Sequence, residues 1–292
     1  MAQITIELIK TLRDRTGAGL NDCKAALVAS EGDLDKASDW LREKGLAKAA
    51  KKADRIAAQG LALALTCEKC GKTVVLEVNC ETDFVAKGDA FREFVENIGK
   101  FILKNEPKDV EAARELTKEL FADATVKMGE KFDLRRFTLI QKDDNVIGTY
   151  IHMGGKIAVA VVFDKISPEL AKQISMHVAA NNPQYISIND VPADVRDHEL
   201  EVQREAAKND EKLANKPANV LDKILEGKIN KYFAEMTLEA QPFLYDDSKT
   251  VGQVLKEAGA KVLCFVRYQV GEGIEKRHDD FASEVMSQVS NK

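Results

Sequence analysis

The sequence predicts an α+β protein in which a small helical domain precedes a core of strands and helices. Apolar residues recur at helical spacing over the first 55 residues, and from residue 61 they alternate as they do in strands. A similar order of segments then occurs twice, with a hairpin, an apolar strand, an acidic turn and an amphipathic helix each time. This order indicates a duplicated α+β unit.

Residues 1–55 are expected to form three short helices and a longer linker helix. The first helix ends at the turn Thr16–Gly19, Asn21 is the expected N-cap of the second, and Asp33 caps the third. Trp40 is the expected centre of this small core. The linker carries a basic stripe, which is either a solvated helix face, as nearby acidic residues favour, or a phosphate-binding patch. The stripe consists of Lys44, Lys48, Lys51, Lys52 and Arg55.

Residues 56–140 are expected to form the first core subdomain, which opens with a hairpin closed through Glu68–Gly71. Its expected elements are strands at 61–66 and 73–79, helices at 89–104 and 110–128, and a strand at 135–141.

Residues 141–275 are expected to form the second core subdomain, interrupted at about 187–236 by a helical hairpin. The first arm of the hairpin is so polar that it is expected to project from the body, and the second has an apolar stripe that includes Val220 and Tyr232. A last helix is expected within 276–292. The other expected elements are strands at 145–155 and 156–165, helices at 168–180 and 250–257, and a strand at 262–270 that returns to the second sheet.

Composition excludes several classes of protein. A net charge of −5 argues against a general nucleic-acid binder, which would be basic. No apolar run approaches the roughly 18 to 20 residues that span a bilayer, and the amino terminus does not resemble a secretory signal. Five cysteines at irregular spacing favour reduced thiols and a cytoplasmic location.

Conventional motifs for chemistry are weak in this chain. The motif Cys67–Cys70 lacks the second knuckle or histidine pair of a metal site and lies in a predicted hairpin turn, where a redox pair is not expected. A metal or redox role stays open beside the plain turn. His177 is predicted to lie in the core, and His152, which opens a glycine turn, is a candidate for partner contact. No phosphate loop or paired-carboxylate constellation is evident, so an enzyme is not expected.

The stretch NCETDFVAK, residues 79–87, is the least ordinary turn of the sequence. It joins an apolar strand to an amphipathic helix and places Asp83 beside Phe84. The pair could be part of an active site, an interaction tip, or a turn whose ring folds inward. Composition favours the inward ring, whereas an exposed ring would be a candidate hot spot for a partner.

Several ordered motifs are similar to those of the bacterial elongation factor Ts family, the exchange factors of elongation factor Tu. The similarity extends over essentially the whole chain. The motifs are LRDRTGAGLNDCKAAL (12–27), KGLAKAAKKADRIAAQG (44–60), LEVNCETDFVAK (76–87), MHVAANNPQYI (176–186), EGKINKYFAEMTLEAQPF (226–243) and TVGQVLKEAGAKV (250–262).

The resemblance implies a UBA-like (ubiquitin-associated) three-helix domain, two related core subdomains, an inserted coiled-coil hairpin and a C-terminal helix. It implies a non-enzymatic guanine-nucleotide exchange factor that is cytoplasmic, needs no cofactor or metal, and contacts neither nucleic acid nor membrane. The implied partner is elongation factor Tu, both GDP-bound and nucleotide-free. A dimer through the hairpin stays open.

The resemblance also assigns contact residues by position. Asp83 and Phe84 would approach the partner's Mg²⁺ and nucleotide, with the ring acting as a wedge. Two features depart from the family, because Asn21 stands where an apolar residue is common and the Cys67–Cys70 motif is not a hallmark. The implied contacts are Thr82, Asp83, Phe84, Val85, Arg13, Leu20, His152 and Gly154.

Two rival functions remain at this point. One is an adaptor that uses the amino-terminal helices to hold a helix or a ubiquitin-like ligand. The other is a thiol or zinc protein centred on Cys67 and Cys70. Release of labelled GDP from elongation factor Tu, together with a zinc assay, would separate them.

Overall fold

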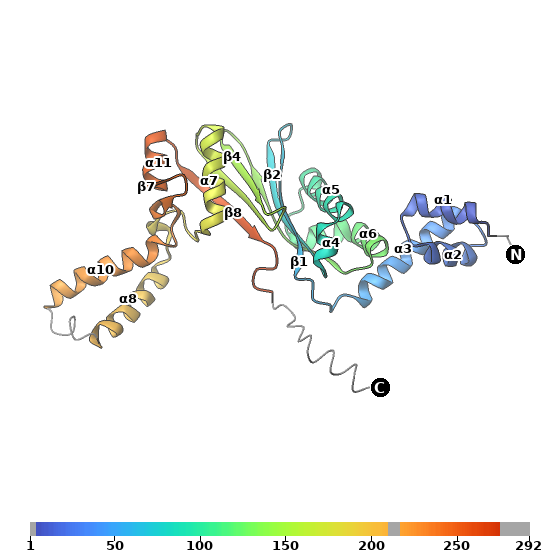
Figure 1. The fold of residues 1–292 in the computed structure, drawn as a ribbon, viewed down its shortest axis with the longest axis horizontal. Helices are drawn as coiled ribbons and strands as arrows, with labels where there is room; N and C mark the ends of the chain where they lie inside the picture. The colour runs from blue at the N-terminus through green and yellow to red at the C-terminus, as the bar shows by residue number, and fades with distance from the viewer. Residues whose placement is uncertain (1–3, 210–216, 275–292) are drawn as a thin grey trace.

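The computed structural model describes residues 4–209 and 217–274, which form a mixture of helices and strands. The molecule is elongated, with three amino-terminal helices at one end, a helical hairpin at the other and two sheets between them (Figure 1). The helix predicted within 276–292 lies outside the described residues. Among the residues that are described, no helix is both long and apolar enough to cross a membrane.

The amino-terminal unit consists of α1 (Ile6–Thr16), α2 (Leu20–Ala29) and α3 (Leu34–Lys51). Asp33 caps α3 as predicted, by accepting from the N–H groups of its first turn. Asn21 is not a cap, because Gly19 takes that position and places Asn21 inside the first turn. The third helix and the linker helix are one element, since no proline separates them and the helix continues through Gly45.

Leucines rather than Trp40 form the centre of this unit. Leu12 and Leu27 are fully buried, whereas Trp40 is half-buried at the edge of the cluster. The ammonium group of Lys44 lies over its ring, 4.5 Å from the centroid. A ring at this position covers the core rather than filling it, so the central role predicted for Trp40 is wrong.

The first sheet is antiparallel, in the order β1-β2-β3, and α5 and α6 cover one of its faces. Core side chains such as Leu76 and Ile98 meet between the sheet and these helices. The elements are β1 (Gln59–Cys67), β2 (Lys72–Cys80), α4 (Asp83–Lys87), α5 (Asp89–Asn105), α6 (Val110–Met128) and β3 (Phe132–Gln141).

The second sheet has the same connectivity, in the order β4-β5-β8. Its last strand returns to this sheet, as the sequence pattern predicts, and pairs with β5. Helix α7 covers one face. The elements are β4 (Val146–His152), β5 (Ile157–Phe163), α7 (Pro168–Asn181) and β8 (Val262–Gln269).

The two sheets share an apolar layer formed by residues such as Ala62, Val75 and Ala160. Both faces of the central strands β2 and β5 are therefore buried, which explains why apolar residues follow one another in both strands, as in Val74–Leu76 of β2, rather than alternating with polar ones. A buried carboxylate also joins the halves. Glu77 accepts from Arg136 at 2.7 Å and from the N–H of Gly271, just beyond β8, at 2.9 Å.

Between α7 and β8 lies the helical hairpin of α8 (Ala193–Lys208) and α10 (Ala218–Ala234). The side of α10 that carries Leu225 and Phe233 is buried. Val220 and Tyr232 were predicted in the apolar stripe but are 39% and 41% exposed, because they lie outside the buried side. The remaining elements are η1 (Ile188–Asp190), η2 (Leu238–Ala240), β6 (Pro242–Phe243), β7 (Asp246–Thr250) and α11 (Val251–Ala258).

Candidate interaction site at the Asp83–Phe84 turn

The stretch after β2 folds into α4, a helix of only five residues. Thr82 is its N-cap, with an extended backbone and a hydroxyl that accepts from the N–H of Val85 at 3.4 Å. Gly88 ends α4 with an extended backbone and also precedes α5. The sequence thus makes a short projecting helix between strand and helix.

Phe84 points away from the core, as the exposed-tip hypothesis predicted. Its side chain is 84% exposed, whereas Ala86 is 4% exposed and Val85 packs partly against the core of the first sheet. Ala86 lies two positions on, about 200° around the helix, so burying it turns Phe84 outward. The inward ring that composition favoured is therefore wrong.

Asp83 presents a charged carboxylate beside the ring. Lys87, one turn further along α4, pairs with it at 2.6 Å. This hydrogen bond holds the pKa of Asp83 below its usual range, so the carboxylate is ionised at neutral pH. A negative charge at the first position of a helix also interacts favourably with the helix dipole.

Cys80 supports the turn from inside. Its thiol is buried and donates to the carbonyl of Thr82 at 3.3 Å. Burial, followed by the nearby charge of Glu130, raises the pKa of Cys80 to about 12. The thiol therefore stays protonated at neutral pH and can act as a donor, which was not evident from the sequence.

The turn between β4 and β5 lies beside the same site. The carbonyl of Gly154 accepts from Arg92, in the first turns of α5, at 3.1 Å. Met153 has a positive φ of 49° and is 72% exposed, while His152 is half-buried with its Nδ1 3.1 Å from the hydroxyl of Tyr150. Met153 is not among the predicted contacts, although an apolar residue before two glycines is a signal of an exposed tip.

Arg13 and Leu20 lie elsewhere. Both are exposed on the amino-terminal helices, Leu20 to 54%, and these helices are at the end of the molecule remote from β4 and β5 (Figure 1). The structure thus brings the 82–85 and 152–154 turns close to one another through Arg92, and leaves the amino-terminal residues on a separate surface.

The basic stripe of the linker is mostly engaged inside the molecule. Lys44 and Lys48 both pair with Asp22, at 3.3 and 2.9 Å. Lys52 donates to the carbonyl of Gly129, and Arg55 pairs with Glu81. These contacts argue against a phosphate-binding patch, because four of its five cations already have protein partners.

The Cys67–Cys70 motif forms a disulfide at the tip of the β1–β2 hairpin. The prediction of reduced thiols is therefore wrong for these two cysteines, because the tight turn brings both sulfurs together. Cys23, Cys80 and Cys264 are free. Within residues 4–209 and 217–274, no group of three or more Cys, His, Asp or Glu side chains could hold a metal ion.

His177 is buried, as predicted. Its Nε2 lies 2.9 Å from Oε1 of Gln241, and its Nδ1 accepts from the N–H of Leu244 at 3.3 Å. Burial lowers the pKa of His177. Both ring nitrogens are thus satisfied by a neutral imidazole, which fits a structural role.

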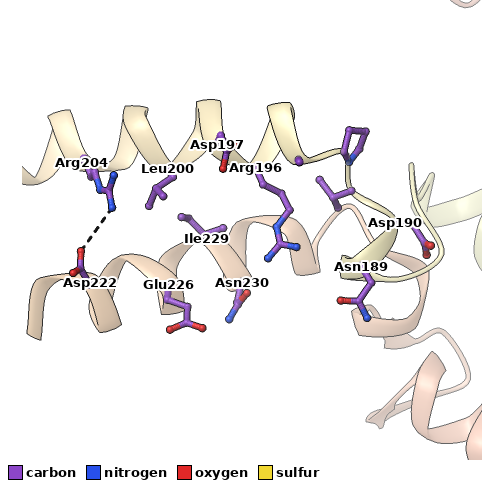
Figure 2. Close-up of a pocket in the computed structure, with 13 residues that line it drawn as sticks. Asn189, Asp190, Arg196, Asp197, Leu200, Arg204, Asp222, Glu226, Ile229 and Asn230 are labelled. Atoms are coloured by element: carbon purple, nitrogen blue, oxygen red, sulfur yellow. Dashed lines mark ion pairs between the residues drawn. The ribbon is translucent and has the colours of Figure 1, made fainter. Parts of the chain in front are cut away.

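A groove of about 750 Å³ lies between the arms of the hairpin. Figure 2 shows Leu200 and Ile229 between the helices, with Arg204 and Asp222 paired across the groove at 3.8 Å. Side chains of both signs line it, including Arg196. The groove thus has no single charge that would select one kind of ligand.

The geometry around Phe84 defines a class of site. A mostly exposed aromatic ring stands on a turn fixed by hydrogen bonds, beside a second turn with an exposed methionine. Rigid aromatic side chains of this kind are typical anchors of protein–protein interfaces. This arrangement is typical of a factor that binds another protein.

Comparison with known proteins places this factor in a family. The model of the family "Elongation factor TS" matches residues 81–272. The chain is also 46% identical, over 297 aligned positions and 99% of each chain, to an elongation factor Ts of Pediococcus pentosaceus. The chain belongs to the elongation factor Ts family.

Proposed function

We propose that this protein is a guanine-nucleotide exchange factor that binds elongation factor Tu and accelerates its release of GDP. The exposed ring of Phe84 on a hydrogen-bonded turn is the observation that carries this proposal. Membership of the elongation factor Ts family supports it.

The proposed mechanism is differential binding. A protein that binds elongation factor Tu more tightly without GDP must weaken GDP binding by the same factor. Phe84 would enter a pocket that exists only when the nucleotide site is distorted, and Asp83 would approach the bound Mg²⁺. GTP would rebind afterwards. No covalent step or catalytic acid is needed, so the function is non-enzymatic and requires no cofactor.

The other candidate contacts extend the proposed interface. Thr82 and Val85 would accompany the ring, and the β4–β5 turn with His152 and Gly154 would touch a second part of the partner. Arg13 and Leu20 would form a third contact. The list of proposed contact residues is Thr82, Asp83, Phe84, Val85, Arg13, Leu20, His152 and Gly154.

The proposed division of the chain follows these roles. Residues 1–55 would be a UBA-like domain, 56–140 and 141–275 the core subdomains, about 187–236 a coiled-coil hairpin, and 276–292 a C-terminal module. The factor would act in the cytoplasm without direct contact to nucleic acid or membrane, and two copies could pair through the hairpin.

Release of GDP tests the proposal directly. Elongation factor Tu is loaded with fluorescent GDP, excess unlabelled nucleotide is added, and the loss of signal is followed with and without this protein. We expect faster release that rises with the concentration of the protein until it saturates. Unchanged release at every concentration would overturn the proposal.

A further inference from the structure

A carboxylate from a distant loop fastens the base of the Phe84 turn. Glu130, between α6 and β3, accepts from the backbone N–H groups of Glu81 and Thr82, each at 3.0 Å. It also accepts from the hydroxyl of Thr82, which itself accepts from the N–H of Val85. The cap of α4 and this carboxylate thus form one chain of hydrogen bonds.

Glu81 makes the return contact. Its carboxylate accepts from the N–H of Lys131 at 2.7 Å and pairs with Arg55 at 3.2 Å. The ammonium group of Lys131 donates to the carbonyl of Arg55 at 2.8 Å. The 81–82 and 130–131 loops therefore each donate backbone N–H groups to a carboxylate of the other loop. Arg55, in the segment after α3, contacts both loops.

We propose that Glu130 is a positioning residue for nucleotide exchange, which holds the turn so that Phe84 is presented in one orientation. This inference rests on the proposed function. A helix of five residues has no stability of its own in water, so contacts outside α4 must fix its direction. Bonds to a charged acceptor are among the strongest available for this purpose.

The first experiment compares Glu130→Met with Glu130→Gln in the GDP-release assay. Met removes every acceptor, whereas the amide oxygen of Gln can still accept from both backbone N–H groups. We expect Met to lower the saturating release rate about 10-fold, with a smaller change in the concentration for half-saturation, because the remaining contacts still bind. Gln should retain most of the rate. Equal losses in the two variants would contradict the acceptor role.

Glu111→Met is the matched control, since Glu111 is exposed on α6 and the same carboxylate is removed there. It should behave as the wild type. Hydrogen exchange gives an independent readout, because the amides of Thr82 and Val85 should exchange faster in Glu130→Met. Unchanged exchange at these amides would contradict the proposal.

A double-mutant cycle separates this inference from the proposed function. If Glu130 acts through the ring of Phe84, Glu130→Met should not lower the saturating release rate any further in a protein that already carries Phe84→Ala. The same loss in both backgrounds, or a normal rate for Glu130→Met alone, would overturn the inference. Failure of the proposed function would differ, because the wild type itself would not release GDP. If Glu130→Met does not fold, Thr82→Val replaces it. This variant removes the hydroxyl that links Glu130 to the N–H of Val85, so the Val85 amide should exchange faster and the release rate should fall only where Phe84 is present.

Discussion

At the scale of single residues, the direction of Phe84 is decided by its neighbours. Fully burying a ring of this size would contribute about 1.5 to 3 kcal/mol, yet Ala86 takes the inward position of α4 instead. A short helix has few positions that face the core, and in α4 the smaller side chains of Val85 and Ala86 occupy them. The same favourable free energy is then available to a partner that covers the ring.

His177 gives a prediction about pH. Burial lowers the pKa of His177 in the folded protein. When the pH falls below 6.5, the ordinary pKa of histidine, the unfolded chain therefore binds a proton at His177 more readily than the folded chain does. The free energy of unfolding should therefore decrease as pH falls below about 6.5, by up to about 1.4 kcal/mol per pH unit from this group. Urea unfolding between pH 7.5 and 5.5 measures it.

The variant His177→Gln is the control for this titration. It removes the titrating group, so its unfolding free energy should depend less on pH than that of the wild type over the same range. Identical slopes for the two proteins would show that another group is responsible.

The sequence predicts the burial of some of these residues but not the role of others. An apolar helix stripe already predicts a buried His177, because burial follows from periodicity. The role of Glu130 is invisible in the sequence, because its partners lie 48 and 49 residues away and the contact depends on how two loops meet.

At the scale of elements, the order of helices and strands follows from periodicity, and the errors occur at the ends. Gly19 rather than Asn21 is the N-cap of α2. Glycine also serves as an N-cap, and it has no side chain that would identify the cap in the sequence. The third helix runs to Lys51 without a break, since the residues after Leu41 are good helix formers apart from Gly45, which packs against α6. The Cys67–Cys70 disulfide depends on the turn geometry that spacing alone did not reveal.

The β1–β2 hairpin gives a second prediction. Cys67 and Cys70 lie at the end of β1–β2 opposite to Cys80, where the Phe84 turn begins. We expect Cys67→Ser with Cys70→Ser to leave GDP release unchanged and to lower the free energy of unfolding by about 2 kcal/mol or less, because the closed loop is short. Urea unfolding and the release assay measure both quantities.

A reductant is the control for the disulfide. Dithiothreitol should destabilise the wild type by the same amount and leave the double variant unaffected. Loss of GDP release in the double variant would favour a functional thiol pair instead.

At the scale of the whole molecule, the amino-terminal unit is held by the crossing of α3 and α6. Gly45 lies so close to α6 that an added Cβ would come within 2.8 Å of Val126 and 3.2 Å of the carbonyl of Ala122. This close approach, and not any local pattern, sets where Arg13 and Leu20 lie relative to the Phe84 turn. The sequence predicted the helical unit but could not predict its placement.

Gly45→Leu should therefore change the position of the amino-terminal unit relative to the first sheet, while each of these units keeps its own fold. The larger side chain should force α3 away from α6, so that the separate contact surfaces no longer fit one partner together. We expect weaker binding to elongation factor Tu by about 10-fold, together with faster hydrogen exchange at the α3–α6 contact. Titration calorimetry measures the affinity.

Gly227→Leu is the matched control for that change. Gly227 also lies within a helix, α10, but an added Cβ would meet nothing within 4 Å. Its binding should equal that of the wild type. Equal binding by Gly45→Leu as well would show that the position of the amino-terminal unit does not matter.

The most direct test of the central claim is the saturating rate of GDP release from elongation factor Tu with Phe84→Ala in place of the wild type. We predict a rate about 10- to 100-fold lower, since the lost contact is worth about 1.5 to 3 kcal/mol, with an unchanged free energy of unfolding because the ring touches solvent. Leu116→Ala, which truncates another exposed apolar side chain, should release GDP as the wild type does. A normal rate with Phe84→Ala would contradict the account.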